Sequence, residues 1–184
     1  PGNTMHKYAD DTYLVIPAAN VQSCAEEIAH IAAWSKQNNL MLNCHKSVEI
    51  IFVPPRGRRV DELPPPAVPS IKRVDAITAL GVTISRKFSV AQHVTNLLAA
   101  CAQTLFALRT LRHHGLLTKA LHSVFQATVV AKLCYASQAW WGFASAADRD
   151  RLESFLCRSA QLGFWDQAAP TLADICERAD VKLF

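Results

Sequence analysis

HKYADDTYLVI, residues 6–16, predicts two short strands joined by a tight turn. The arm after the turn is rich in β-branched and aromatic residues, which strands favour. Aspartate tolerates the backbone angles of tight turns, so we expect the turn at Ala9-Asp10-Asp11. Two adjacent carboxylates repel each other, and a hard cation such as Mg²⁺ or Mn²⁺ would relieve that repulsion. A polar, solvated surface turn is the alternative interpretation.

Residues 23–53 predict an α+β layer. Ser23-Cys24-Ala25-Glu26 has the pattern of a capping box, and the helix that it opens should end near Asn38-Asn39. A strand at 40–42, a turn and a second strand at 48–52 are expected to follow. The helix would then pack on one face of the sheet.

The stretch from Pro54 to Pro69 holds six of the nine prolines and predicts a surface loop. Its cluster Arg56-Gly57-Arg58-Arg59 either contacts phosphate or is simply solvated. Strands are expected at 71–74 and 80–84. Gly81 inside a strand is typical of a close approach by another backbone or a ligand, or of a bulge.

From about residue 88 onward the pattern is helical. Apolar residues recur at spacings of three and four between Val94 and Leu111, and Gly115 ends that helix. The pair Trp140-Trp141 ends the next helix and serves either as a stacking platform for nucleic acid or in packing. The expected N-terminal caps of these helices are Ser89, Thr118, Ser145 and Thr171.

The net charge of +4 is unevenly distributed. Residues 64–132 carry eight Lys and Arg against a single acid, Asp75, whereas acids outnumber bases on either side. A localised basic surface favours a polyanionic partner, most simply a nucleic-acid backbone. A generic basic surface is the alternative.

The six cysteines form no CxxC pair and predict reduced thiols in an intracellular protein. No apolar run of membrane-spanning length and no leader pattern is expected, so no membrane partner is predicted. The chain reaches its hairpin almost at once after Pro1. We therefore expect it to be the C-terminal part of a longer polypeptide.

The order of these features resembles that of reverse transcriptases, most closely those of non-LTR (LINE-type) retrotransposons. Short motifs recur by chance, but several in the right order are more specific. The matching features, in chain order, are the YxDD-like hairpin Lys7-Tyr8-Ala9-Asp10-Asp11-Thr12, the helix with Trp34 followed by Leu40, Leu42-Asn43 and Lys46-Ser47, the primer-grip-like Leu80-Gly81-Val82 with Phe88 and His93, and the thumb-like helices with Tyr135 and Trp140.

This resemblance implies a partial polymerase palm at 1–88, an antiparallel sheet with a packed helix, followed by an all-helical thumb at 89–142. Residues 143–184 would be a C-terminal helical extension. The fingers, the second metal-binding aspartate of the palm and an endonuclease would come from the same polyprotein. The complete enzyme would be an RNA-directed DNA polymerase, and the chain alone would have little or no activity because that aspartate is absent.

The resemblance also assigns the catalytic roles. Asp10 would be the principal ligand and Asp11 a supporting ligand for Mg²⁺ or Mn²⁺, with two ions in the complete enzyme. Lys46 would lie near the departing pyrophosphate as a general acid or electrostatic clamp, or would be a solvated turn lysine. Deoxynucleoside triphosphates would be the substrates.

An RNA template with a DNA primer would be the bound duplex. Tyr8 would lie beside it or would be an ordinary strand aromatic. Leu80, Gly81 and Val82 would let the primer backbone come close. The residues expected to follow the duplex phosphates without reading sequence are Arg109, Arg112 and Lys119.

Two other interpretations stay open. The chain could be a non-catalytic nucleic-acid-binding module of the same ancestry. It could also be an unrelated α+β domain whose turn spells YADD. The pairs His113-His114 and Cys44-His45 lack the spacing of metal ligands and are expected to be structural.

Overall fold

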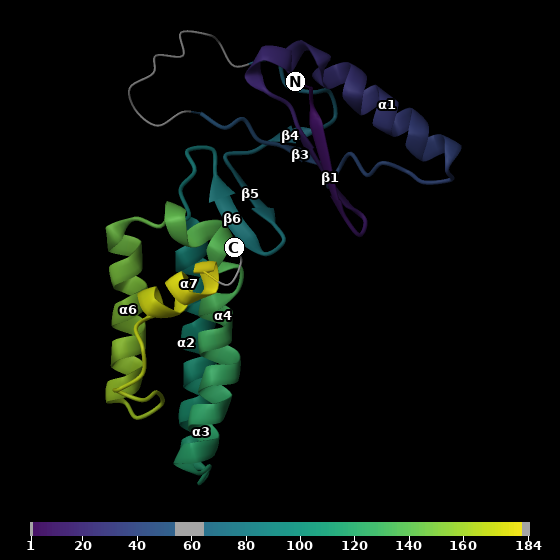
Figure 1. The fold of residues 1–184 in the computed structure, drawn as a ribbon. Helices are drawn as coiled ribbons and strands as arrows, with labels where there is room; N and C mark the ends of the chain where they lie inside the picture. Colours follow the sequence, from purple (N-terminus) through teal and green to yellow (C-terminus); the bar gives the residue numbers. More distant parts are fainter. Residues whose placement is uncertain (1, 54–64, 182–184) are drawn as a thin grey trace. The chain divides into compact units, whose positions relative to one another are not determined.

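A computed structural model describes residues 2–53 and 65–181 (Figure 1). It divides the chain into two compact units, unit 1 (Pro1–Asp75) and unit 2 (Ala76–Phe184). Helices and small sheets occur together, which confirms the α+β class. The division falls before residue 88, the expected boundary. The strand at 82–85 packs against the helix at 91–113, and the strand at 76–79 pairs with that strand.

Unit 1 begins with the predicted hairpin. Its strands pair antiparallel, and its helix ends, as predicted, at Asn38, which is followed by Asn39 with a left-handed φ of 56°. The elements of unit 1 are β1 (Thr4–Tyr8), β2 (Asp11–Val15), the 3₁₀ helix η1 (Ala18–Ser23), α1 (Cys24–Gln37), β3 (Val48–Glu49) and β4 (Lys72–Arg73).

The capping box predicted at Ser23 is wrong. η1 runs directly into α1, so Ser23 already has helical backbone angles and makes no side-chain cap. Its hydroxyl instead donates to the carbonyl oxygen of Asn20 at 2.9 Å. α1 does begin after Ser23, at Cys24, but the 3₁₀ helix that runs into it leaves no need for a side-chain cap.

The strand predicted at 40–42 is also absent, although residues 40–42 are described. β3 pairs instead with β4, in parallel, across the proline-rich stretch. The Arg73 guanidinium reinforces this pairing, since its Nε donates to the Glu49 carboxylate at 2.8 Å. Most of the predicted loop, 54–64, lies outside the described residues.

Unit 2 is organised around α2, which contacts β6, α3, α4 and α6 (Figure 1). Its buried residues follow the predicted spacing, and Gly115 follows its end with a φ of 88°. The elements are β5 (Ala76–Ala79), β6 (Val82–Ser85), α2 (Ala91–His113), α3 (Thr118–Phe125), the π-helical η2 (Gln126–Val130), α4 (Ala131–Cys134), α5 (Ser137–Trp140), η3 (Trp141–Phe143), α6 (Ala146–Gln161) and α7 (Leu172–Val181).

The predicted helix caps succeed at the two C-terminal helices. The Ser145 hydroxyl accepts from the Asp148 N–H at 3.1 Å. Thr171 and Asp174 exchange reciprocal bonds, each side chain accepting from the other residue's N–H at 3.1 Å. The prediction is wrong at Thr118, because Leu117 precedes α3 and makes no side-chain cap.

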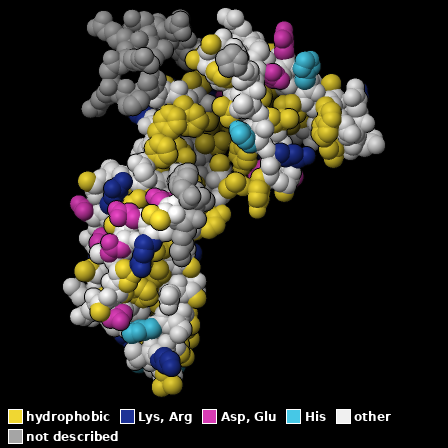
Figure 2. Space-filling model, in the orientation of Figure 1, with side chains coloured by type: hydrophobic (Ala, Val, Ile, Leu, Met, Phe, Trp, Pro, Cys, Tyr) yellow, Lys and Arg dark blue, Asp and Glu magenta, His cyan; other side chains and the backbone are white. Residues whose placement is uncertain are grey.

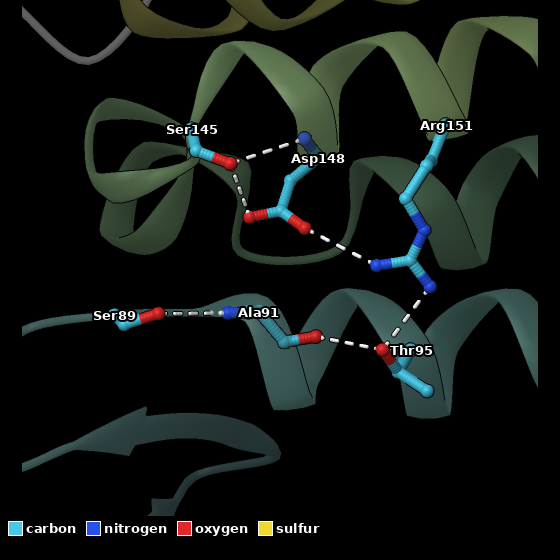
Figure 3. A network of polar contacts seen from close by, with 6 residues as sticks. All are labelled: Ser89, Ala91, Thr95, Ser145, Asp148 and Arg151. Atoms are coloured by element: carbon cyan, nitrogen blue, oxygen red, sulfur yellow. Dashed lines mark hydrogen bonds and ion pairs between the residues drawn. The ribbon is translucent and has the colours of Figure 1, made fainter.

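A polar network joins α6 to α2 (Figure 3). Arg151 donates to the buried carboxylate of Asp148 at 3.2 Å and to the hydroxyl of Thr95 on α2 at 3.1 Å. The capping residue Ser145 donates to the same carboxylate at 2.7 Å. The start of α6 is therefore fixed against α2 by hydrogen bonds as well as by apolar packing.

Trp140 connects the strands of unit 2 to its helices. Its ring is fully buried, and its Nε1–H donates to the carbonyl of Tyr135 at 3.0 Å. The imidazole of His93 lies edge-on to it, with ring centroids 5.2 Å apart. His93 Nδ1 in turn accepts a long bond, 3.5 Å, from the backbone N–H of Thr83 on β6.

α2 is the single helix in the described parts of the chain that is long and apolar enough to span a membrane. Its residues Val94, Cys101 and Leu108 are buried in the core of unit 2. The central helix of a folded core has this composition without any membrane.

All six cysteines are unpaired. Burial raises the pKa of the Cys101 and Cys176 thiols to about 11. These two thiols therefore stay protonated and unreactive at neutral pH.

The stability of unit 2 should depend on the charge of His93. Burial lowers the pKa of His93 below its ordinary value of 6.5, so the unfolded chain binds more protons in acid than the folded chain. The free energy of unfolding should therefore fall as the pH falls below 6.5. His93→Gln retains an acceptor for Thr83 without titrating, and it should weaken this dependence in urea denaturation.

His113→Gln is the matched control, because His113 is exposed on the same helix. It should leave the pH dependence of the wild type unchanged. Equal slopes for the wild type and His93→Gln would contradict the assignment.

Candidate functional site

The acidic turn lies at the tip of the β1–β2 hairpin. Tyr8 pairs with Asp11, which leaves Ala9 and Asp10 as a two-residue loop. Ala9 has a φ of 53°, a left-handed conformation. This conformation costs an L-residue such as alanine about 1–2 kcal/mol. The hairpin prediction is confirmed, and it contains a strained residue next to the first carboxylate.

Both carboxylates of the turn are exposed. Neither Asp10 nor Asp11 forms an ion pair or a side-chain hydrogen bond with any residue that the structure describes. Tyr8, on the same face of the hairpin as Asp11, has 64% of its surface exposed. The turn therefore presents two unneutralised carboxylates and an aromatic ring to solvent.

Adjacent carboxylates supply the hard oxygen ligands that Mg²⁺ and Mn²⁺ prefer. Within residues 2–53 and 65–181, however, no group of three or more His, Cys, Asp or Glu side chains could hold a metal ion. Asp10 and Asp11 thus fit a divalent cation in type of ligand. They would share the ion with water, a bound phosphate or carboxylates of another segment.

The hairpin is attached to α1 by polar and aromatic contacts. The amide of Asn3 donates to Glu27 at 2.7 Å and to Ser23 at 2.8 Å. Lys7 Nζ lies 5.8 Å from the ring centroid of Trp34. Because side chains alternate along a strand, Lys7 points to the face opposite Tyr8 and Asp11, and the attachment to α1 leaves the acidic face open.

Lys46 lies in unit 1, in the turn that follows α1. Its side chain is exposed, and its backbone N–H donates to Asn43 Oδ1 at 3.2 Å. No hydrogen bond or ion pair joins the described side chain of Lys46 to Asp10 or Asp11. Its assigned role near a pyrophosphate stays a prediction.

The prediction that Gly81 lies inside a strand is wrong. Leu80 and Gly81 form the two-residue turn between β5 and β6, with φ values of 47° and 83°. Val82 begins β6 and is buried in the core of unit 2. Leu80 and Gly81 are exposed, so two of the three primer-grip candidates are on the surface.

The predicted basic residues are all exposed, but they differ in their contacts. Arg112 Nη1 donates to the carbonyl of Leu162 at 2.6 Å, and its guanidinium lies 4.3 Å from the ring centroid of Phe164. Arg112 therefore has a packing role, while Arg109 and Lys119 form no such contact with the described residues. On the face shown in Figure 2, basic and acidic side chains of unit 2 are interspersed.

Trp140 and Trp141 are both buried, which confirms the packing interpretation and excludes a stacking platform. Arg149 covers Trp141, with its guanidinium carbon 5.0 Å from the ring centroid. The candidate site residues are divided between the two units. Unit 1 carries Tyr8, Asp10, Asp11 and Lys46, whereas unit 2 carries Leu80, Gly81, Val82, Arg109, Arg112 and Lys119.

Comparisons with protein-family models, with curated proteins and with solved structures found no match to this chain. The likeness to reverse transcriptases therefore depends on the sequence motifs themselves.

Sequence reasoning missed the contact between Tyr135 and the β5–β6 turn. The Tyr135 hydroxyl donates to the carbonyl of Leu80, 55 positions away, at 3.2 Å. Glycine at the second loop position was a partial signal for this turn, because Asn-Gly and Asp-Gly are the preferred pairs there and Leu-Gly is not. Nothing in the local sequence predicts its partner.

The strain at Ala9 can be measured. Ala9→Gly removes the left-handed penalty, so it should raise the free energy of local opening of β1 and β2 by up to about 1 kcal/mol. Amide exchange in these two strands should slow accordingly. Ala9→Val should accelerate exchange, because a β-branched residue is poorly accommodated at this φ.

Ala29→Gly, at an exposed position in α1, is the matched control. It should destabilise its helix by about 1 kcal/mol. If Ala9→Gly destabilised the hairpin in the same way, Ala9 would not be strained.

Proposed function

We propose that this chain is a fragment of the RNA-directed DNA polymerase of a non-LTR retroelement, a palm remainder followed by a helical thumb. The observation that carries the proposal is the exposed pair Asp10-Asp11 at the tip of a β-hairpin, with no counter-charge among the described residues. Adjacent carboxylates kept apart from basic side chains are suited to hold a cation.

Asp10 is the proposed principal ligand of Mg²⁺ or Mn²⁺, and Asp11 the supporting one. When bound, two such ions would stabilise the attacking and leaving oxygens as a primer 3′-hydroxyl attacks the α-phosphate of a deoxynucleoside triphosphate. Tyr8 would form one side of this site, on the same face of the hairpin as Asp11. Lys46 would supply a positive charge or a proton to the pyrophosphate as it leaves.

The apolar surface of unit 1 supports a role as part of a larger fold. No hydrophobic side chain between residues 2–53 or 65–75 is buried, whereas the described core lies entirely in unit 2. Exposed apolar patches of this kind mark surfaces that another protein segment covers. The large hydrophobic residues exposed in unit 1 are Met5, Tyr8, Val15, Trp34, Leu40, Met41, Val48 and Phe52.

The upstream palm and fingers of the same polyprotein would cover this surface and supply the other metal-binding aspartate. The working complex would hold an RNA template paired with a DNA primer inside the cell, in the nucleus or cytoplasm. Unit 2 would contact the duplex through phosphates, which carry no sequence information.

A non-catalytic nucleic-acid-binding module is the second candidate. It is favoured by a compact unit 2 with Arg109 and Lys119 exposed, and by the lack of a three-ligand metal group in the described residues. The two functions differ in whether the acidic pair binds a divalent cation.

The acidic pair should bind a divalent cation even without activity. Titration with Mn²⁺ should broaden the amide resonances of residues 8–12 in the 184-residue chain, because a paramagnetic ion relaxes nearby nuclei. Asp10→Asn with Asp11→Asn should abolish the broadening, and Asp150→Asn with Asp166→Asn, two exposed acids of unit 2, should not. If the broadening persisted in Asp10→Asn with Asp11→Asn, the proposed metal site at these two residues would be wrong.

Primer extension gives a second readout of the same proposal. The chain alone should extend an RNA-templated DNA primer no faster than background, since one metal-binding aspartate lies outside it. Extension above background that Asp10→Asn leaves intact would refute the catalytic assignment. Loss of Mn²⁺ binding together with retained duplex binding would favour the non-catalytic module.

Binding to a duplex should depend on salt. Each phosphate neutralised by a Lys or Arg contributes about 0.9 to the slope of log affinity against log salt for double-stranded DNA. Arg109→Gln with Lys119→Gln should therefore lower that slope by about 2 in fluorescence anisotropy with an RNA–DNA hybrid. Arg112 is left intact because it packs on Phe164.

The charge-matched control is Arg158→Gln with Arg178→Gln, two exposed arginines of α6 and α7. It should leave the slope close to that of the wild type. Equal slopes in both double variants would mean that the duplex does not contact the α2–α3 end of unit 2.

A further inference from the structure

The turn between α2 and α3 is tightly hydrogen-bonded and lies at the lowest point of unit 2 in Figure 1. The N–H of Gly115 donates to the carbonyl of Arg112 at 3.0 Å, and the N–H of Leu116 to that of Leu111 at 3.1 Å. With Gly115 at a φ of 88°, these two bonds form a Schellman motif. Arg112 also donates to the carbonyl of Leu162, at 2.6 Å, so the turn is fixed to the chain after α6.

The two consecutive leucines of this turn lie in opposite environments. Leu116 packs against the core, whereas Leu117 has 76% of its surface exposed. Leu117 is the N-cap residue of α3, where it makes no side-chain hydrogen bond. Leucine is among the least favourable N-cap residues, because it cannot accept from the first N–H groups of the helix. A position that lowers local stability without burying its side chain is typical of a functional site.

Leu117 is surrounded by positive charge. Between residues 76 and 147 the chain has six Lys and Arg and no Asp or Glu. Three of the six, Arg109, Arg112 and Lys119, lie in or beside the turn and are exposed. No ion pair joins these three side chains to an acid among the described residues. An exposed leucine among such cations is complementary to a partner with an anionic surface and an apolar interior.

A nucleic acid and a membrane with acidic lipids both have this character, and the size of the apolar tip distinguishes them. Full burial of one leucine changes a binding constant about ten- to hundredfold. Stable membrane binding takes more than this, since even a single myristoyl chain anchors a protein only marginally. A single leucine, isoleucine, methionine or phenylalanine is, by contrast, a usual wedge between neighbouring base steps of a duplex. The tip therefore favours a nucleic acid.

We propose that Leu117 is a wedge that enters between neighbouring base pairs of the bound duplex and unstacks them, while Arg109 and Lys119 contact nearby phosphates. The proposal rests on the function proposed above, because it takes the RNA–DNA hybrid as the ligand. It goes beyond phosphate contacts, since it predicts that the bound duplex is distorted and that sites which unstack easily are preferred.

The fluorescence of 2-aminopurine tests the wedge, because this base becomes brighter when its neighbours unstack. The 184-residue chain should raise the fluorescence of an RNA–DNA hybrid that carries 2-aminopurine beside one central mismatch. Leu117→Ser should abolish the rise, whereas Leu117→Met should retain it, since methionine is also a wedge residue. Serine is a better N-cap, so Leu117→Ser should unfold at a higher urea concentration than the wild type, and misfolding would not explain the loss.

The preference for a mismatch gives an independent readout. Unstacking costs less at a mismatch, so the wild type should bind the mismatched hybrid at least about threefold more tightly than the fully paired one. Leu117→Ser should bind the two hybrids equally, at an unchanged salt slope, because leucine displaces no counterions. Val181→Ser on α7 is the matched control, since Val181 is 78% exposed, and it should retain the wild-type preference.

A fluorescence rise that persists in Leu117→Ser would overturn the wedge, and so would equal wild-type affinity for the mismatched and the paired hybrid. Neither result would contradict the proposed polymerase function. If the wild-type chain bound neither hybrid, the proposed function and the wedge would both fail. Binding to phosphatidylserine vesicles without binding to the hybrids would assign the tip to a membrane and overturn the proposal.

Discussion

The folding of unit 2 depends on the complete burial of Trp140. A buried indole must find an acceptor for its N–H, and the acceptor here is the carbonyl of Tyr135, at a break between two helical segments. That break releases Tyr135 from the helix and directs its ring toward the β5–β6 turn. The ring of Trp140 also excludes water from His93, which explains why the neutral imidazole is favoured.

Unit 1 is stabilised differently. Its hairpin is attached to α1 through the amide of Asn3 and the contact of Lys7 with Trp34, and its strands β3 and β4 through the Glu49–Arg73 ion pair. Such half-exposed polar contacts contribute little each, commonly below about 1 kcal/mol. In the described parts of the chain, unit 1 therefore relies on these polar contacts, whereas unit 2 has a buried apolar core.

The sequence predicted the elements that depend on neighbouring residues. The β1–β2 hairpin, the end of α1 at Asn38 and the caps at Ser145 and Thr171 all follow from local preferences. The failures lie where distant contacts decide. β3 takes β4 as its partner rather than residues 40–42, and Gly81, expected inside a strand, lies in the turn between β5 and β6. Within the site, the pattern placed Asp10 correctly on the turn, whereas Asp11, also expected there, is the first residue of β2.

The turns of the β1–β2 and β5–β6 hairpins show that the position of a turn in the sequence does not determine how its strain is offset. Each begins with a non-glycine residue at positive φ, Ala9 in one and Leu80 in the other. At Leu80 a distant tyrosine offsets the strain, whereas no side-chain hydrogen bond to the Ala9-Asp10 loop exists among the described residues. Strain that persists at an exposed turn without such support is typical of functional sites. Asp10 and Asp11, beside this strained residue, have no counter-charge among the described residues, so a divalent cation bound as proposed above would reduce the repulsion between the two carboxylates.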